Sequence, residues 1–118
     1  MNRLNEIEAR ANAATEGPWF PNRYSDDWEV CGELDDNGNP ALVASEAVGV
    51  DAEFIAHART DVPDMAAALR AVLDLHRPKR PIVDVHGTPI PWDYCEVCDD
   101  EWPCPTVETI RQHIGDDL

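Results

Sequence analysis

Three of the four cysteines lie close together near the C-terminus, in the stretch YCEVCDDEWPCPTVETI, residues 94–110. Cys95 and Cys98 are separated by two residues, the spacing with which two thiolates in a tight turn reach one tetrahedral Zn²⁺. Cys104 follows after five intervening residues and can supply a third sulfur. Soft sulfur ligands favour zinc over magnesium or calcium. The spacing therefore predicts a zinc site that includes Cys95, Cys98 and Cys104.

The fourth ligand of this site is not fixed by the cysteine spacing. Structural zinc sites usually have four protein ligands, and His76, His86 and His113 are the candidates, with Cys31 a more remote choice. A closed site of four protein ligands would be structural, whereas a vacant fourth position beside a pocket would indicate a metal-dependent hydrolase. Two other interpretations are a thioredoxin-like redox pair, which requires a strand-to-helix junction, and a cysteine-rich loop without a ligand.

A second candidate site lies in DAEFIAHARTD, residues 51–61. The imidazole of His57 and the guanidinium of Arg59 could hold a phosphate or a carboxylate, with Asp51 nearby and Trp19 as a stacking face. The alternative is a structural polar network in which Glu53 pairs with His57 and the aspartates cap helices. The chain has no glycine-rich phosphate loop and no serine-centred motif beside these groups. We therefore predict a ligand-binding site and no catalytic residue.

The charge balance limits the classes of partner. The chain has 118 residues, of which 24 are acidic and 9 basic, so its formal net charge is −15. Such a surface repels phosphate backbones and anionic membranes, which argues against direct nucleic-acid binding and membrane association. It suits a basic protein partner or mimicry of DNA phosphates, and it also simply favours solubility.

The sequence also predicts a cellular compartment. The N-terminal segment MNRLNEIEAR is charged and lacks the apolar region of a signal peptide, and no apolar run reaches transmembrane length. We therefore expect a cytoplasmic protein. Thiols stay reduced there, so that clustered cysteines are more often metal ligands than disulfides.

Apolar spacing and turn residues predict the elements of the first half of the chain. Residues 2–15 have helical spacing, with Asn2 as the N-cap and Gly17 and Pro18 as stop signals. DWEVCGEL and ALVASEAV flank the turn DDNGNP and predict a β-hairpin. PWFPNRY predicts a further edge strand, because prolines are confined to sheet edges. Cys31 within the hairpin is expected to be a small packing residue.

The second half begins with the strongest helical pattern, residues 48–76. Asp51 is expected to be its N-cap, and Pro63 predicts two helices that meet at TDVP. A short helix is predicted in TVETIRQHI. The residues expected to face the core are Phe54, Ile55, Leu69, Val72 and Leu73.

These patterns together predict an α+β fold, in which a small β-hairpin or meander packs against two to three helices and a C-terminal tail is held by zinc. We expect an α+β core domain over residues 1–77 and a proline-rich linker arm over residues 78–92. The tail with the cysteine motif and the short helix then covers residues 93–118.

Three stretches carry a resemblance to a known family. RLNEIEARANAATEGPW and DAEFIAHARTDVPDMAAALRAVL resemble the Ead-like family of small early proteins from phages and prophages. The ending LHRP…CEVC…WPCPTVETI resembles the tail of versions from actinobacterial phages. One Lys against eight Arg is also typical of a GC-rich genome. The hairpin region and the linker arm take no part in the resemblance.

The resemblance implies a non-enzymatic phage accessory protein that binds a host factor. Because LHRP accompanies the cysteine motif in tails of this type, it favours His76 as the fourth zinc ligand, with Cys95, Cys98 and Cys104. One alternative function is a sponge that sequesters a nucleotide-type signal of host antiviral defence, bound by Trp19, His57 and Arg59. Another is an acidic DNA-mimic inhibitor. In each case the protein could also form an oligomer.

Overall fold

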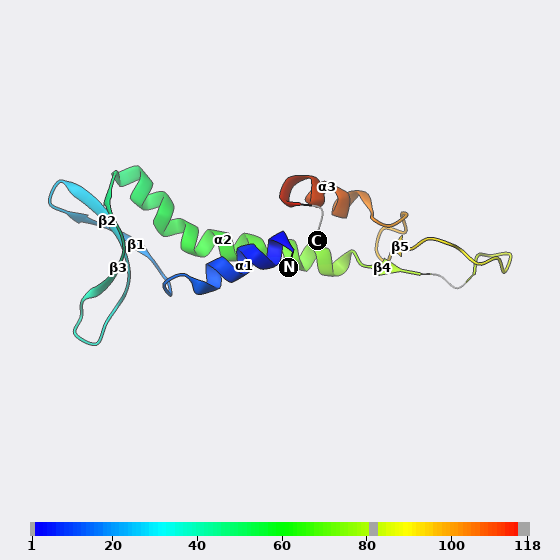
Figure 1. The fold of residues 1–118 in the computed structure, drawn as a ribbon, viewed down its shortest axis with the longest axis horizontal. Helices are drawn as coiled ribbons and strands as arrows, with labels where there is room; N and C mark the ends of the chain where they lie inside the picture. The colour runs from blue at the N-terminus through cyan, green and yellow to red at the C-terminus, as the bar shows by residue number, and fades with distance from the viewer. Residues whose placement is uncertain (1, 81–82, 116–118) are drawn as a thin grey trace. The chain divides into compact units, whose positions relative to one another are not determined.

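The computed structural model describes residues 2–80 and 83–115 and has the predicted α+β architecture (Figure 1). Internal contacts divide the chain into two compact units, one of Ile7–Ala66 and one of Met1–Glu6 with Ala67–Leu118. This division falls within two helices, whereas the sequence placed a domain boundary after residue 77. The elements in order are α1 (Arg3–Ala13), β1 (Phe20–Tyr24), β2 (Asp27–Leu34), β3 (Pro40–Ala47), α2 (Gly49–Leu75), β4 (Pro78–Lys79), β5 (Tyr94–Cys95) and α3 (Pro105–Ile114).

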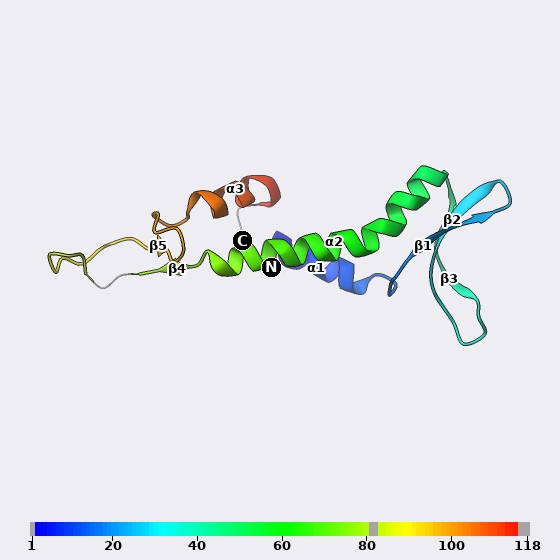
Figure 2. The same cartoon turned by 180° about the vertical axis from the view of Figure 1, so that it is seen from behind.

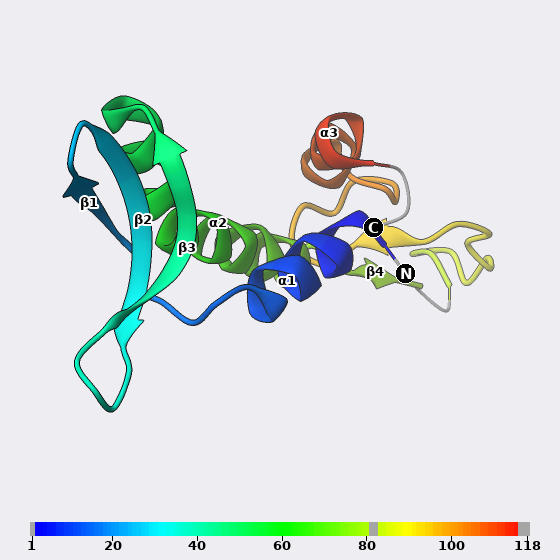
Figure 3. The same cartoon turned by 60° about the vertical axis from the view of Figure 1, so that its left-hand side comes forward.

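The unit Ile7–Ala66 contains a three-stranded antiparallel sheet of order β1-β2-β3, drawn in Figure 3. The predicted hairpin of β2 and β3 is confirmed, and the carboxylate of Asp35 accepts hydrogen bonds from the backbone N–H groups of Asn37 and Asn39 in its turn. Gly38 has φ 82°, a left-handed conformation that suits glycine. β1 forms the edge, as its prolines predicted, with Pro21 opposite Val30.

The core of this unit lies between the sheet and the first half of α2. Val30, Ala52 and Ala56 are buried at its centre. Small alanine side chains form the face of α2 that packs against Val30. At Gly49 an added Cβ would lie 3.0 Å from Nε1 of Trp28, so that a larger residue would displace this indole. The residues that pack around the centre are Trp19, Trp28, Val43, Ala44, Ala47 and Ile55.

α2 differs from the prediction because it is one helix and not two. It runs without interruption from Gly49 to Leu75, with Pro63 inside. A proline in a helix interior removes one backbone hydrogen bond and costs about 3 kcal/mol. The flanking sequence is rich in alanine, which has the highest helix propensity and favours continuation across this position. The break expected at TDVP was therefore wrong.

Two further expectations for α2 were also wrong. The backbone N–H of Ala52 donates to the carbonyl of Val48, so the helix begins before Asp51, which lies in its first turn and is not the N-cap. Phe54, expected in the core, is 76% exposed. A helix turns 100° per residue, so Phe54 points away from the face that carries Ala52 and Ala56. Ile55 does pack against the core, as predicted.

The second unit contains the last turns of α2 and the C-terminal part of the chain. β4 and β5 form a short antiparallel pair in which Pro78 lies opposite Cys95 and Lys79 opposite Tyr94. Residues 83–92, the β4–β5 loop, project away from α3 (Figure 2). At the base of this loop, Nε of Arg80 donates to Oδ1 of Asp93 over 2.8 Å. The predicted C-terminal helix is confirmed as α3.

Candidate metal centre

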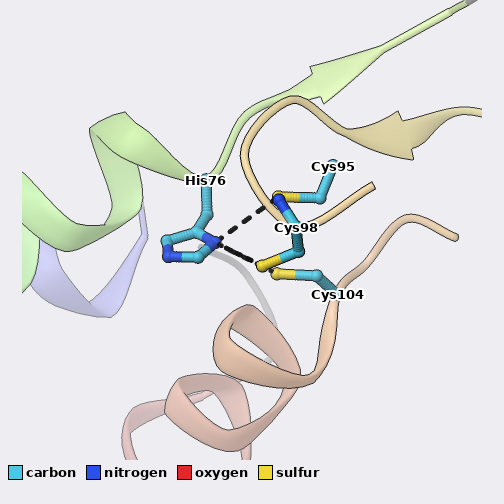
Figure 4. Close-up of side chains that lie close together, drawn as sticks. All are labelled: His76, Cys95, Cys98 and Cys104. Carbon is cyan, nitrogen blue, oxygen red and sulfur yellow. Dashed lines mark hydrogen bonds between the residues drawn. The ribbon is translucent and has the colours of Figure 1, made fainter. Parts of the chain in front are cut away.

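His76 follows directly after α2, and its backbone N–H still donates to the carbonyl of Val72 over 3.2 Å. This last helical hydrogen bond fixes the backbone from which the imidazole projects. Nδ1 of His76 lies 3.4 Å from Sγ of Cys95, 3.2 Å from Sγ of Cys98 and 3.5 Å from Sγ of Cys104 (Figure 4). We call these four residues the metal cluster.

The spacing within the metal cluster fits one tetrahedral ion. Zinc bonds of about 2.3 Å to sulfur and about 2.0 Å to nitrogen, at tetrahedral angles, place each sulfur about 3.5 Å from the nitrogen. The three observed nitrogen-to-sulfur distances of 3.2–3.5 Å agree with this value. All four ligand atoms lie within 4.8 Å of one another. The cluster can therefore hold a metal ion.

Cys95 and Cys98 are positioned by a tight turn that follows β5. The backbone N–H of Cys98 donates to Sγ of Cys95 over 3.5 Å. The N–H of Asp99 donates to the carbonyl of Cys95 over 2.9 Å, and Asp99 has φ 62°. The turn is closed by the N–H of Cys95, which donates to the carbonyl of Asp100 over 2.7 Å. Backbone hydrogen bonds thus direct both thiols toward the same point.

Cys104 is positioned by the beginning of α3. It is the N-cap of that helix, in an extended conformation, and Pro105 occupies the first helical position. Its carbonyl accepts the first helical hydrogen bond, from the N–H of Glu108 over 2.9 Å. The side chain is buried against Val107 and Trp102. The third sulfur is therefore held by a helix start, and not by the turn that holds the first two.

The electrostatics of the metal cluster favour a bound cation. Burial raises the pKa of the Cys95 thiol, but hydrogen bonds from the Cys98 and Val97 backbone, with contacts to His76 and Cys104, outweigh it and lower this pKa from 9.0 to about 7. Burial and the neighbouring sulfurs raise the pKa of Cys98 to about 11. One thiolate thus forms readily, whereas a second one beside it is strongly disfavoured. A divalent cation would relieve this repulsion.

Of the three histidines proposed from the sequence, the structure places His76 in the cluster. Nδ1 of His113 lies 2.9 Å from the carbonyl of Thr109 on its own helix. His86 is exposed in the β4–β5 loop. Cys31 belongs to the other unit, in β2, and its buried thiol donates to Oε1 of Glu29 over 3.6 Å. Burial and the Glu29 carboxylate raise the pKa of Cys31, consistent with a packing residue.

The second candidate site is assembled only in part, with Trp19 and Arg59 in contact. The guanidinium of Arg59 lies 5.9 Å from the centre of the Trp19 ring. Nε of Arg59 and Nε1 of Trp19 both donate to the carbonyl of Thr15, over 3.0 and 2.8 Å. An added Cβ at Gly17 would lie 2.8 Å from Cγ of Arg59, so that this close approach requires glycine. These bonds hold the loop between α1 and β1 in place.

Asp51 and His57 lie apart from the Trp19–Arg59 pair, and both are exposed. Two helical residues correspond to a rotation of about 200°, so His57 projects from the face of α2 opposite to Arg59. Asp51 precedes Arg59 by eight residues, about 12 Å along the helix. A cavity of about 160 Å³ beside Trp19 and Arg59 is lined otherwise by apolar residues of α1, of α2 and of the loop that follows α1.

The sequence analysis missed a cavity next to His76. Its volume is about 230 Å³, and its lining includes Leu73 and Trp102 with the charged side chains of Arg70, Asp74 and Arg77. Asp74 and Arg77 form an exposed ion pair of 3.6 Å. Arg70 and Asp74, four residues apart in the last turns of α2, were the available signal, because positions three and four apart share one helix face.

No family model, curated protein or solved structure matches the chain. The relationship to Ead-like proteins therefore remains a prediction from the quoted stretches. Within the described ranges, none of the helices combines the length and apolar character needed to cross a membrane.

Proposed function

We propose that this protein is a non-enzymatic phage accessory protein that binds a host protein, and that Zn²⁺ in the metal cluster stabilises its C-terminal part. The observation that carries the zinc part of the proposal is the composition of the cluster, and the host-binding part rests on the resemblance to Ead-like proteins. Three cysteines and one histidine converge on one point, and four protein ligands complete the usual coordination of a structural zinc ion.

The proposed role of the metal is architectural. A single ion would join three segments: the end of α2 through His76, the turn after β5 through Cys95 and Cys98, and the start of α3 through Cys104. Small units with few buried apolar side chains commonly gain their stability from such a metal. A hydrolase would require an open coordination position for water, so the four-ligand set does not favour catalysis.

The β4–β5 loop is the surface that we assign to the host protein. Val85 is 95% exposed and Trp92 is 51% exposed. Exposed large apolar side chains on a projecting segment are typical of interaction sites. The remaining surface has a large excess of acidic residues. The expected partner is therefore a basic protein with an apolar pocket, and this fits the accessory role that the Ead-like resemblance implies.

The nucleotide-sponge alternative is less favoured. Arg59 already bonds a backbone carbonyl, and the adjacent cavity of about 160 Å³ is smaller than the roughly 300 Å³ at which small-molecule sites begin.

Affinity capture from an actinobacterial lysate tests the proposal. Zinc-loaded wild type should retain a host protein saturably, and Val85→Asp combined with Trp92→Ala should lower its retention at least tenfold. Leu42→Asp is the matched control, because Leu42 is exposed on the sheet of the other unit. Failure to capture any saturable partner, or equal capture by the loop variant, would contradict the assignment.

A further inference from the structure

The proposed function makes no use of the cavity of about 230 Å³ next to His76, which we call the His76 cavity. Its lining residues all belong to the unit that contains the metal cluster. Arg70 and Asp74 lie on one face of α2, because they are four residues apart, and Arg77 follows three residues later. The end of α2 thus brings two guanidinium groups to one cavity.

Basic side chains are scarce in this chain, yet they gather at the His76 cavity. Acidic residues outnumber Lys and Arg by 24 to 9 over the whole chain, whereas two arginines and a single aspartate line the cavity. The aspartate, Asp74, lies 3.6 Å from Arg77, and both side chains are more than half exposed. The lining therefore has a net positive charge, which favours an anionic ligand.

His76 adds a hydrogen-bond donor to this lining. Nδ1 faces the three sulfurs, and the second ring nitrogen points away from them (Figure 4). When Nδ1 binds a metal, a neutral imidazole carries its hydrogen on Nε2. His76 lines the cavity, and the three cysteines do not belong to the described lining. Nε2–H is therefore the group that this side chain can offer to a ligand in the cavity.

The His76 cavity also has apolar walls, supplied by Leu73, Trp102 and Val107. Val107 is buried, and the other two side chains are half-buried. A cavity of about 150 Å³ is large enough to bind benzene, so a volume of about 230 Å³ accommodates a ring of that size together with a carboxylate. It is too small for a nucleotide, because pockets for larger ligands begin at roughly 300 Å³.

We propose that the His76 cavity binds a small carboxylate with an apolar body, such as an aromatic acid. The apolar body packs against Leu73 and Trp102, and the carboxylate accepts hydrogen bonds from Arg70 and Arg77, whose guanidinium groups match it in geometry. Arg70 also donates to Oδ1 of Asn5, but a guanidinium has five N–H donors and can bond both groups.

The apolar walls decide between a carboxylate and a phosphate. Both anions suit the two arginines, but inorganic phosphate has no apolar part and would leave the walls without a partner. The site goes beyond the binding of a host protein, and it rests on the proposed zinc only for the hydrogen on Nε2 of His76.

A titration of the zinc-loaded full chain with benzoate, followed by nuclear magnetic resonance, tests the ligand class. We expect a dissociation constant of about 1 mM or lower and a saturable shift of the Trp102 indole N–H, which Trp102→Phe identifies. Benzyl alcohol lacks the charge and acetate lacks the ring, so each should bind about tenfold more weakly. Inorganic phosphate that binds as tightly as benzoate overturns the proposal. A chain that holds zinc but shows no saturable shift with benzoate refutes this site alone.

Charge variants test the role of the cavity lining. Arg77→Gln removes a charged donor and should weaken benzoate binding about tenfold. Asp74→Asn removes the carboxylate that repels the ligand and should tighten binding about threefold. Arg23→Gln is the matched control, because Arg23 is exposed in the other unit. Circular dichroism and metal analysis verify that each variant is folded and zinc-loaded. Equal affinities of Arg77→Gln and Arg23→Gln would overturn the site, as would weaker binding by Asp74→Asn.

Discussion

Individual residues of the metal cluster have different roles, although all four ligand atoms meet at one point. Cys95 is the sulfur that backbone hydrogen bonds prepare as a thiolate, and its pKa is about 7. Cys98 has a pKa raised to about 11 by burial and the neighbouring sulfurs, so its thiol is protonated at neutral pH in the absence of a cation. His76 offers Nδ1 to the three sulfurs. Its other ring nitrogen is thereby free for an outer hydrogen bond, as is usual for metal-bound histidine.

Zinc affinity should fall as the pH falls, because protons compete with the metal for sulfur. Above pH 7 the binding of zinc releases at least the Cys98 proton, since that pKa is about 11. The association constant should then fall at least tenfold per pH unit, because the other thiols of the cluster also exchange protons for the metal. Below the Cys95 pKa of about 7 one more proton must leave, which makes the fall about tenfold steeper per unit. Competition titrations with a chromogenic chelator measure both slopes. A zinc affinity that does not change between pH 6 and pH 8 would contradict this order of deprotonation.

Arg59 should contribute to the stability of the unit Ile7–Ala66. Arg59→Ala removes the hydrogen bond to Thr15 and the contact with the Trp19 ring, and should lower the free energy of unfolding by about 1–2 kcal/mol. Urea denaturation followed by tryptophan fluorescence measures this change. Arg23→Ala is the control, because Arg23 is exposed on an edge strand. Equal stability of the two variants would show that the interactions of Arg59 are not structural.

At the scale of elements, local signals predicted most of the fold. The asparagine cap of α1 is present, since Oδ1 of Asn2 accepts from the N–H of Asn5 over 2.8 Å. The hairpin, the edge strand and α3 also follow from turn residues and periodicity. The continuation of α2 as a single helix could not be predicted in this way. Whether Pro63 breaks the helix depends on packing interactions, which the sequence does not reveal. Phe54 was misplaced for a related reason: apolar character alone does not indicate which face of a helix is covered.

The β4–β5 loop should be dispensable for the metal centre. Lys79 and Tyr94 are paired across the strands, so replacing residues 80–93 with Asn-Gly closes the hairpin directly. We expect the shortened protein to bind one zinc ion per chain, as wild type does, and to lose the host protein. Metal analysis and affinity capture measure the two properties separately. Loss of zinc from the shortened protein would show that the loop is part of the site.

For the whole molecule, the sequence predicted the chemistry of the site better than the organisation of the chain. The thiol spacing identified three of the four residues that could hold a metal ion, but the histidine could not be chosen from spacing, because the choice depends on where α2 ends. The division into two units within α1 and α2 was not predicted either. It depends on contacts between residues distant in sequence, such as the approach of Leu73 at the end of α2 to the cluster around Cys104.

Removal of the metal should loosen one unit and spare the other. In the unit with the metal cluster, Cys95, Cys104 and Val107 form a buried cluster, so the packing of this cluster depends on the sulfurs. Without zinc, the backbone amides of residues 94–114 should exchange hydrogen much faster. Those of β2 and of the first half of α2 should not change, because the Val30 core contains no metal ligand. Hydrogen exchange with mass spectrometry, before and after chelation, measures this contrast. Uniform loss of protection would contradict it.

The central claim is that His76, Cys95, Cys98 and Cys104 together hold one structural zinc ion. The most direct test is the metal content of the purified protein, measured for wild type and for Cys98→Ser and His76→Ala. Cys31→Ser and His113→Ala are the matched controls, because neither residue belongs to the cluster. We expect one zinc ion per chain in wild type and in both controls, and a loss of zinc from both cluster variants. Zinc retained in Cys98→Ser and His76→Ala alike would contradict the site.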